Sequence, residues 1–216
     1  MNIEQARFNM IEQQIRPWNV LDTTLLELLA VVKREDFVPP AYRSMAFMDL
    51  EIPLPGGQSM FSPKLEARLV QDLDVHKHET VLEVGTGSGY MAALLAHKAQ
   101  RVITLEIRPE LAQFARDNIR RAGIANVEVV QADGSQGHAA QGPYDAILLS
   151  GSVAQVPQEL LAQLKPGGRL VAIVGNEPVM TAVRITQDGG RLATQPLFDT
   201  IAPRLVGFAE APRFHF

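Results

Sequence analysis

The ten residues VLEVGTGSGY, from Val81 to Tyr90, decide the fold that the sequence predicts. An apolar, β-branched stretch leads into glycines at alternate positions, Gly85, Gly87 and Gly89, and then into an apolar helical pattern. Because glycine has no Cβ and tolerates positive φ, such a strand–loop–helix turn lets the backbone approach a ligand closely. The start of the helix adds backbone N–H groups that have no partner within the helix. We therefore expect a ligand at this turn.

The spacing of the glycines distinguishes between two classes of cofactor. The dinucleotide fingerprint is G-x-G-x-x-G, and its third glycine allows close packing of helix on strand. Here the run is G-x-G-x-G, and Tyr90 stands where that fingerprint needs glycine. NAD and FAD are therefore disfavoured. The run E-x-G-x-G-x-G, which begins at Glu83, instead resembles the first motif of class I methyltransferases that bind S-adenosylmethionine. The alternative is a glycine-rich turn without a ligand.

From residue 80 onward, apolar strands alternate regularly with amphipathic helices. Near-continuous apolar strands separated by helices are typical of a parallel sheet that is covered on both faces. Strands are predicted at 80–84, 101–106, 127–132, 144–150 and 169–175, with helices between them at 90–98, 109–123 and 157–165. The fold class is therefore α/β, a doubly wound, mostly parallel and Rossmann-like sheet.

The pattern changes after Gly175, where the helices stop. TAVRITQDGGRLATQPLF, residues 181–198, predicts a C-terminal hairpin that turns at Asp188-Gly189-Gly190. These two strands bring the expected sheet to seven, with the order of the last two left open. The tail FDTIAPRLVGF, residues 198–208, is a candidate for one more strand.

The first 50 residues contain no alternation of strand and helix, and we expect them to form a helical cap on the main domain. Residues 3–17 predict an amphipathic helix with Phe8, Ile11 and Ile15 on one stripe. A second helix follows, with Asp22 as its N-cap. The expected division is thus a cap of residues 1–50 and a main domain of residues 51–216.

The segment IPLPGGQSMFSP, residues 52–63, contains three prolines and two glycines. Such a composition predicts a rigid, irregular loop. Ser62 followed by Pro63 is a standard signal for the start of a helix, with serine as the N-cap and proline at the first helical position.

Composition excludes several classes of function. The chain of 216 residues has a net charge of −4 and contains no block of basic residues, which disfavours nucleic acid as a partner. It has no cysteine, so disulfides, a thiolate nucleophile and Cys-type zinc sites are absent, and its five histidines lack ligand spacing. No metal site is expected. No signal-peptide pattern and no apolar run of membrane-spanning length is present, so a cytoplasmic protein is expected.

Acidic residues follow two further strands at the edge where the glycine loop is expected. Ligands of doubly wound sheets bind at the carboxyl ends of the strands, near the point where strand order reverses. Glu106 ends the second strand about twenty residues past the loop, and its carboxylate is suited to accept ribose hydroxyls. Asp133 ends the third strand beside Gly134 and is suited to accept an adenine amino group.

Several longer motifs resemble the protein-L-isoaspartate O-methyltransferase family. They are FNMIEQQIRPWNVLD (8–22), REDFVPPAY (34–42), LPGGQSMFSP (54–63) and the block from Asp133 to Gly175, which contains PYDAILL and QLKPGGRLVAIVG. The resemblance implies a class I methyltransferase sheet with S-adenosylmethionine as cofactor and S-adenosylhomocysteine as product. It implies that the substrate is the free carboxylate of an isoaspartyl residue in a damaged protein or peptide, and that methylation begins the repair of that residue.

The glycine motif and the resemblance together imply a set of site residues. The implied cofactor-binding residues are Met60, Glu83, Val84, Gly85, Thr86, Gly87, Ser88, Gly89, Tyr90, Glu106, Ile107, Asp133, Gly134 and Ser150. The catalytic candidates are Ser59 and Ser62. An acceptor carboxylate is already ionised at pH 7, so the reaction requires no general base. The lack of a nucleophile–base set in the sequence agrees with this chemistry.

The sequence departs from the family pattern at positions that the resemblance implies face the substrate. Phe61 stands where the family's Q-T-I-S-x-P loop has serine, Ser62 lies one place later, and Ser59 matches the family's threonine. Near the end, Ala202-Pro203-Arg204 replaces Val-Pro-Leu. Phe61 keeps open the alternative of a methyltransferase with another, small-molecule acceptor. A protein that binds S-adenosylmethionine without catalysis is a further alternative, ranked last.

Overall fold

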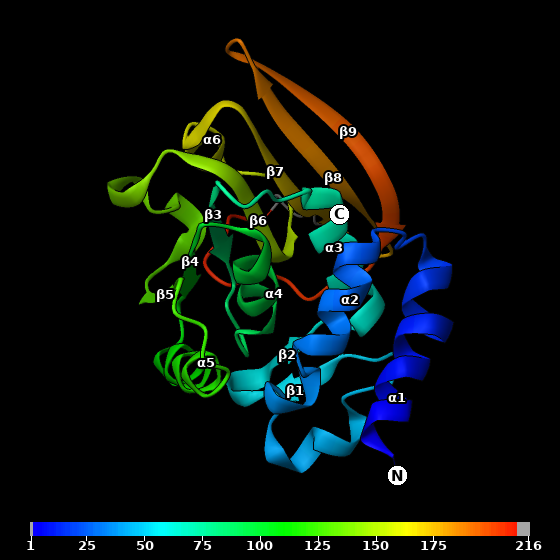
Figure 1. Ribbon diagram of the computed structural model, residues 1–216. Coiled ribbons are helices and arrows are strands. Elements are labelled where there is room, and N and C mark those ends of the chain that lie inside the picture. Colours follow the sequence, from blue (N-terminus) through cyan, green and yellow to red (C-terminus); the bar gives the residue numbers. More distant parts are fainter. Residues whose placement is uncertain (1, 211–216) are drawn as a thin grey trace, which may run out of the picture.

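The central sheet of the protein has seven strands in the order β5-β4-β3-β6-β7-β8-β9 (Figure 1). The structure is a computed structural model that describes residues 2–210. The strands are β3 Thr80–Val84, β4 Arg101–Glu106, β5 Val127–Gln131, β6 Tyr144–Val153, β7 Leu164–Asn176, β8 Val179–Asp188 and β9 Arg191–Thr200. Strands β3 to β7 pair in parallel, and β8 and β9 add in antiparallel fashion. The predicted doubly wound α/β fold with a C-terminal hairpin is confirmed.

Strand order reverses at β3, and this reversal positions the site. From β3 the chain proceeds outward through β4 to β5, then returns to the other side of β3 with β6. The carboxyl ends of β3, β4 and β6 therefore meet at one edge, where a doubly wound sheet leaves a crevice for ligands. The glycine loop follows β3 at this edge.

Helices cover the two faces of the sheet unequally, and successive residues of β3 show why. Val81 faces a core that includes the helices α2 to α5, whereas Leu82 faces a second core that includes Leu160 and Leu161 of α6. The helices are α1 Ile3–Asn9, α2 Thr23–Val31, α3 Pro63–Leu73, α4 Tyr90–Lys98, α5 Pro109–Arg121 and α6 Gln158–Leu161. Both faces of the parallel strands are buried, which explains their near-continuous apolar sequence.

The N-terminal helix departs from the prediction in its register. After α1 the chain continues as a π-helical turn, Met10–Ile15, and a 3-10 turn, Arg16–Trp18. A π turn contains more residues per turn than an α-helix, so it rotates the apolar stripe relative to an ideal helix. Ile11 and Ile15 are buried as predicted, but Phe8 is 58% exposed, and its place on the buried stripe was wrong. The predicted N-cap of α2 is confirmed, since the Asp22 side chain accepts hydrogen bonds from Thr24 N and Leu25 N.

Residues 52–60 also differ from the irregular loop that the prolines predicted. They form a two-stranded antiparallel ribbon, β1 Ile52–Leu54 and β2 Gln58–Met60, which turns at Gly56 with φ of 71°. Prolines are tolerated there because the ribbon is short and all of its strands are edges. The ribbon delivers Phe61 and Ser62 to the start of α3.

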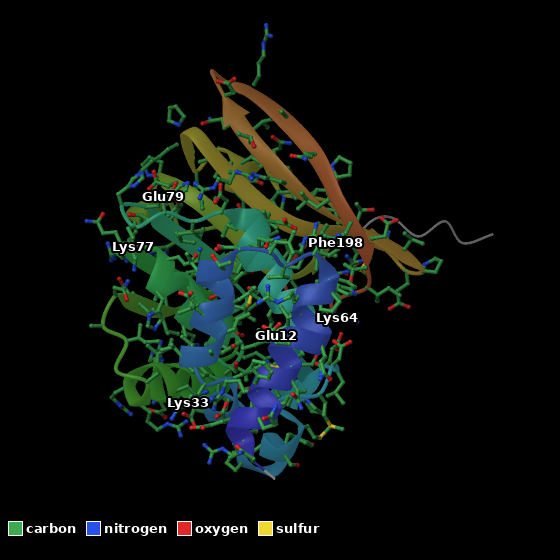
Figure 2. All side chains as sticks on the ribbon, turned by 45° about the vertical axis from the view of Figure 1, so that its right-hand side comes forward. Glu12, Lys33, Lys64, Lys77, Glu79 and Phe198 are labelled. Atoms are coloured by element: carbon green, nitrogen blue, oxygen red, sulfur yellow. The ribbon has the colours of Figure 1, made fainter. Side chains whose placement is uncertain are left out.

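The hairpin β8–β9 contacts the N-terminal segment through Phe198. Its ring lies edge-on to Trp18, with ring centroids 5.7 Å apart, and the Arg68 guanidinium lies 4.9 Å from its centroid. Figure 2 shows Phe198 where β9 meets the N-terminal helices. The hairpin thereby packs against the N-terminal helical segment and α3.

The tail after β9 is not the further strand that the sequence suggested. Residues 201–210 run back across the carboxyl ends of the central strands (Figure 1), with a single bridge between Arg204 and Ser152 of β6. Ser152 N donates to Pro203 O at 2.7 Å, and Leu205 N donates to Ser152 O at 2.9 Å. These two bonds fix the tail over the site.

Among residues 2–210, none of the helices has the length and apolar character that a membrane span requires. The cytoplasmic location and the division at residue 50 stay predictions.

Candidate cofactor and acceptor site

Two adjoining cavities lie at the carboxyl ends of β3 and β6. The main cavity is lined by Leu54, Gln58, Ser59, Phe61, Val84, Gly85, Gly87, Leu105, Glu106, Ile107, Leu111, Gly134, Ser150, Gly151, Pro203, Arg204, Leu205, Val206 and Phe208. The smaller second cavity is lined by Leu54, Ser59, Met60, Phe61, Glu66, Gly85, Thr86, Gly87, Ser88, Tyr90, Met91 and Ser150. The glycine loop and Ser150 belong to both cavities.

The glycine loop has the backbone conformation for which its glycines were singled out. Gly85, Gly87 and Gly89 have φ of 95°, 53° and 84°, a region that residues with a Cβ rarely adopt. Gly85 N and Thr86 N donate to Leu105 O at 2.9 and 3.2 Å, which draws the loop over the end of β4. A Cβ on Gly89 would lie 3.2 Å from Ile119, so this glycine serves helix packing and lines neither cavity.

Glu106 links the loop to the end of β4. Its side chain is buried, and its carboxylate accepts hydrogen bonds from Gly87 N at 2.9 Å and Arg108 N at 3.0 Å. Each carboxylate oxygen has further lone pairs beyond these bonds. The carboxylate therefore lines the main cavity as a fixed acceptor, as its position at the strand end predicted.

Glu83 lies fully buried at the centre of a hydroxyl network. Thr104 donates to one carboxylate oxygen and Ser150 to the other, each at 2.7 Å, and the Thr104 hydroxyl also bonds with that of Thr86 at 2.6 Å. Burial raises the pKa of Glu83 to about 7, although the two hydroxyl bonds oppose the shift and Glu106 adds to it. The network ties β3, β4 and β6 together under the glycine loop.

This pKa makes the stability of the protein depend on pH. Between about 4.5 and about 7 the folded chain holds a proton that the unfolded chain releases, so stability falls as pH rises through that window. Glu83→Gln should remove a fall of up to about 3 kcal/mol, measured by urea unfolding across that range in variant and wild type. Parallel pH profiles for the two proteins would show that Glu83 ionises in the folded state at its ordinary pKa.

The loop after β2 brings Phe61 into both cavities. Phe61 is 5% exposed, and its carbonyl accepts a hydrogen bond of 2.7 Å from Arg34, which also pairs with Glu66. Of the two predicted catalytic serines, Ser59 lines both cavities and donates to Glu51 at 2.9 Å. Ser62 is not among the described residues that line either cavity.

Ser62 instead begins helix α3. Its backbone carbonyl accepts from Leu65 N and Glu66 N, each at 3.1 Å, while its side chain makes no capping bond. Its position as the N-cap of α3 is therefore confirmed, and its hydroxyl takes no part in the cap.

The remaining predicted residues divide between the two cavities. Met60, Thr86, Ser88 and Tyr90 line the second cavity, whereas Val84, Ile107 and Gly134 line the main one. Within the described chain, the buried Tyr90 hydroxyl has no hydrogen-bond partner.

Asp133 lies beside the main cavity and holds a turn. Its carboxylate accepts from Ser135 N at 2.9 Å, and a Cβ on Gly207 of the tail would lie 2.9 Å from it. The next residue, Gly134, packs so closely on Val84 that an added Cβ would lie 2.3 Å from a valine methyl. Asp133, the acceptor predicted for an adenine amino group, therefore lies next to the tail beyond the end of β5 and is not among the described lining residues.

Sequence reasoning identified only part of the contribution of the tail, the departure at Ala202-Pro203-Arg204. Pro203, Arg204, Leu205, Val206 and Phe208 all line the main cavity. Leu205 packs onto the glycine loop, because a Cβ on Gly85 would lie 2.7 Å from its side chain. Leu205, Val206 and Phe208 were missed, because nothing local in the sequence assigned these apolar residues to the cavity.

A doubly wound sheet with an acidic–glycine loop after β3 and a buried carboxylate at the end of β4 defines a class I methyltransferase. The model of the family "Protein-L-isoaspartate(D-aspartate) O-methyltransferase (PCMT)" matches residues 5–201, and the chain belongs to this family.

Curated relatives match over almost their whole length. The protein-L-isoaspartate O-methyltransferase of Geobacter metallireducens is 40% identical over 209 residues, which are 96% of each chain. That of Methanoculleus marisnigri is 39% identical over 203 residues, or 94% of this chain and 92% of the relative.

Solved structures share the fold. A Plasmodium falciparum structure in complex with S-adenosyl-L-homocysteine has a TM-score of 0.81 at 21% identity, covering 95% of this chain and 98% of the other. A structure named protein-L-isoaspartate O-methyltransferase has a TM-score of 0.80 at 25% identity, covering 95% of this chain and 66% of the other.

Proposed function

We propose that the protein transfers a methyl group from S-adenosylmethionine to the free carboxylate of isoaspartyl residues in proteins and peptides. The observation that carries this proposal is the family match over residues 5–201, in a chain whose loop after β3 and Glu106 form one continuous cavity wall. The curated relatives that cover nearly all of the chain bear the same name.

The residues of the main cavity fit the proposed cofactor. The glycine loop offers backbone without side chains, and the Glu106 carboxylate is fixed as an acceptor suited to ribose hydroxyls. Asp133, which lies outside the lining next to Gly134, is an acceptor suited to an adenine amino group. The buried Glu83 places a carboxyl group beneath the loop. When bound, S-adenosylmethionine supplies an electrophilic methyl group on a sulfonium, and the sulfur leaves as a neutral thioether.

The chemistry asks little of the protein beyond positioning. A carboxylate oxygen forms the new bond to the methyl carbon, the C–S bond breaks, and its electron pair stays on sulfur, so no proton moves. The acceptor is already ionised at pH 7. The protein must therefore align the reactants and exclude water. The buried Phe61, which lines both cavities, is suited to exclude water and supplies no hydroxyl.

A second candidate function, methylation of a different acceptor, rests on this same Phe61. Its ring occupies the position where the family motif has a small hydroxyl side chain, and it reduces the room available to an acceptor. Ser59 then provides the hydroxyl nearest in sequence among the lining residues.

The deciding experiment compares two peptides that differ only in isoaspartate against aspartate. Labelled methyl transfer from S-adenosylmethionine to the isoaspartyl peptide alone is the expected result. Transfer to neither, with cofactor binding confirmed by calorimetry, would overturn the proposed function and favour another acceptor or a binding protein without turnover. In that case the variant Phe61→Ser distinguishes another acceptor from a binding protein without turnover. A gain of isoaspartyl activity in this variant would identify Phe61 as the reason why the wild type does not methylate the isoaspartyl peptide.

A further inference from the structure

The tail places one basic side chain at the site. Arg204 is held in register with β6 because its two neighbours hydrogen-bond to Ser152, through Pro203 O at 2.7 Å and Leu205 N at 2.9 Å. Among the described residues that line the main cavity, Arg204 is the only basic one. Backbone pairing with β6 therefore fixes where the backbone of Arg204 lies at the site.

The guanidinium of Arg204 is oriented but keeps free donors. Nη1 donates to Gly175 O at 2.9 Å, and Nη2 donates to Asn176 Oδ1, both at the carboxyl end of β7. Nε lies 3.4 Å from a carboxylate oxygen of Glu210. A guanidinium has five N–H donors, so these two hydrogen bonds leave three, of which the one on Nε faces Glu210. The side chain is 25% exposed, which leaves it open to solvent and to a ligand.

The charges around the cavity make this cation significant. Glu106 lines the cavity. An acceptor carboxylate entering beside this acidic group is repelled unless a positive group faces it. A planar guanidinium matches a carboxylate geometrically and forms charge-assisted hydrogen bonds with it.

We propose that Arg204 binds the carboxylate of the acceptor, an inference that rests on the proposed function. One carboxylate oxygen bonds to the guanidinium, and the other remains available to the methyl donor. Glu210, whose side chain is 53% exposed and whose contact with Nε is long, is the partner that the acceptor displaces. The methyl ester is neutral, so the product cannot form this ion pair. The product therefore binds more weakly than the substrate.

The test compares peptide binding in the presence of S-adenosylhomocysteine, by fluorescence anisotropy, for an isoaspartyl peptide and its neutral isoasparagine analogue. Arg204→Gln should weaken binding of the isoaspartyl peptide by about ten- to a hundredfold and leave the analogue unchanged. KM should rise in proportion, with kcat changed far less. Arg191→Gln removes an exposed arginine at the start of β9, at the turn of the hairpin, and should change neither affinity.

Two further variants keep the test informative if Arg204→Gln disturbs the tail. Arg204→Lys keeps the charge without the planar fork and should give an intermediate affinity. Glu210→Gln removes the competing carboxylate and should tighten binding of the isoaspartyl peptide. Calorimetry with S-adenosylhomocysteine checks that each variant keeps its cofactor site.

Two negative outcomes are distinct. A wild type that transfers no methyl group to the isoaspartyl peptide overturns the proposed function and this inference with it. A wild type that is active, with Arg204→Gln binding both peptides as the wild type does, overturns the inference alone and leaves Arg204 as a tie between the tail and β7.

Discussion

Arg34→Met is expected to lower the free energy of unfolding by about 3–5 kcal/mol. Arg34 is 1% exposed and Glu66 is 2% exposed, and the Arg34 Nε donates to the Glu66 carboxylate at 2.8 Å. The guanidinium also donates to Ala46 O and Phe61 O, each at 2.7 Å. The variant leaves a buried carboxylate without its counter-charge and two carbonyl oxygens without donors, which is the costly way to break such a pair.

Urea unfolding at neutral pH measures this loss, and a surface pair provides the control. Arg43→Met removes the partner of Asp36 in the same part of the chain, where both side chains are more than half exposed, and should cost less than about 1 kcal/mol. Burial raises the pKa of Glu66, and loss of Arg34 raises it further, so the destabilisation should shrink as pH falls and Glu66 takes up a proton. Equal losses for the two variants would refute the account of Arg34.

Glu106→Gln should weaken the binding of S-adenosylhomocysteine by about a hundredfold or more. The Glu106 carboxylate accepts from Gly87 N and Arg108 N, one on each oxygen. An amide has a single oxygen, so its NH2 group must face one of these backbone donors. The loop then loses its anchor to β4, and the ribose loses a charged acceptor.

Calorimetric titration of the two proteins with S-adenosylhomocysteine checks this prediction. Glu128→Gln is the matched control, since Glu128 lies on the neighbouring strand β5, is 46% exposed and pairs with Arg101 away from the cavities. The control should bind as the wild type does. If Glu106→Gln also kept full affinity, the carboxylate would serve only to shape the loop, and the ribose would lie elsewhere.

The sequence predicted the bounds of helices and strands most accurately where local pattern and long-range packing agree. The strands 80–84 and 101–106 and the helix 90–98 occur with the predicted bounds, because an apolar run ending at glycines has one compact arrangement in a parallel sheet. Glu106 was identified by its distance from the glycine loop, which the βαβ geometry sets. Its two backbone donors follow from the same turn.

The parts that could not be predicted depend on contacts between distant residues. Strand β6 extends beyond Ser150 to Val153 because Ser152 and Val153 resume pairing with Ile173 and Val174 of β7 after a break in register, and the tail adds a bridge to Ser152. The environment of Arg34 depends on carbonyl groups that no sequence pattern marks. Phe8 is exposed because a π turn replaces the regular helix after it. In each case a local motif was compatible with several partners, and only the folded chain selected one.

The path of the tail has a consequence for the synthesis of the protein on the ribosome. Every strand of the sheet, from β3 to β9, is synthesised before the residues 203–208 that close the main cavity. Chains fold from the N-terminus as they are made, at roughly 5–20 residues per second. The strands of the scaffold are therefore encoded ahead of the residues that complete the ligand site. A chain that ended after β9 would contain every strand of the sheet but would lack this part of the wall of the main cavity.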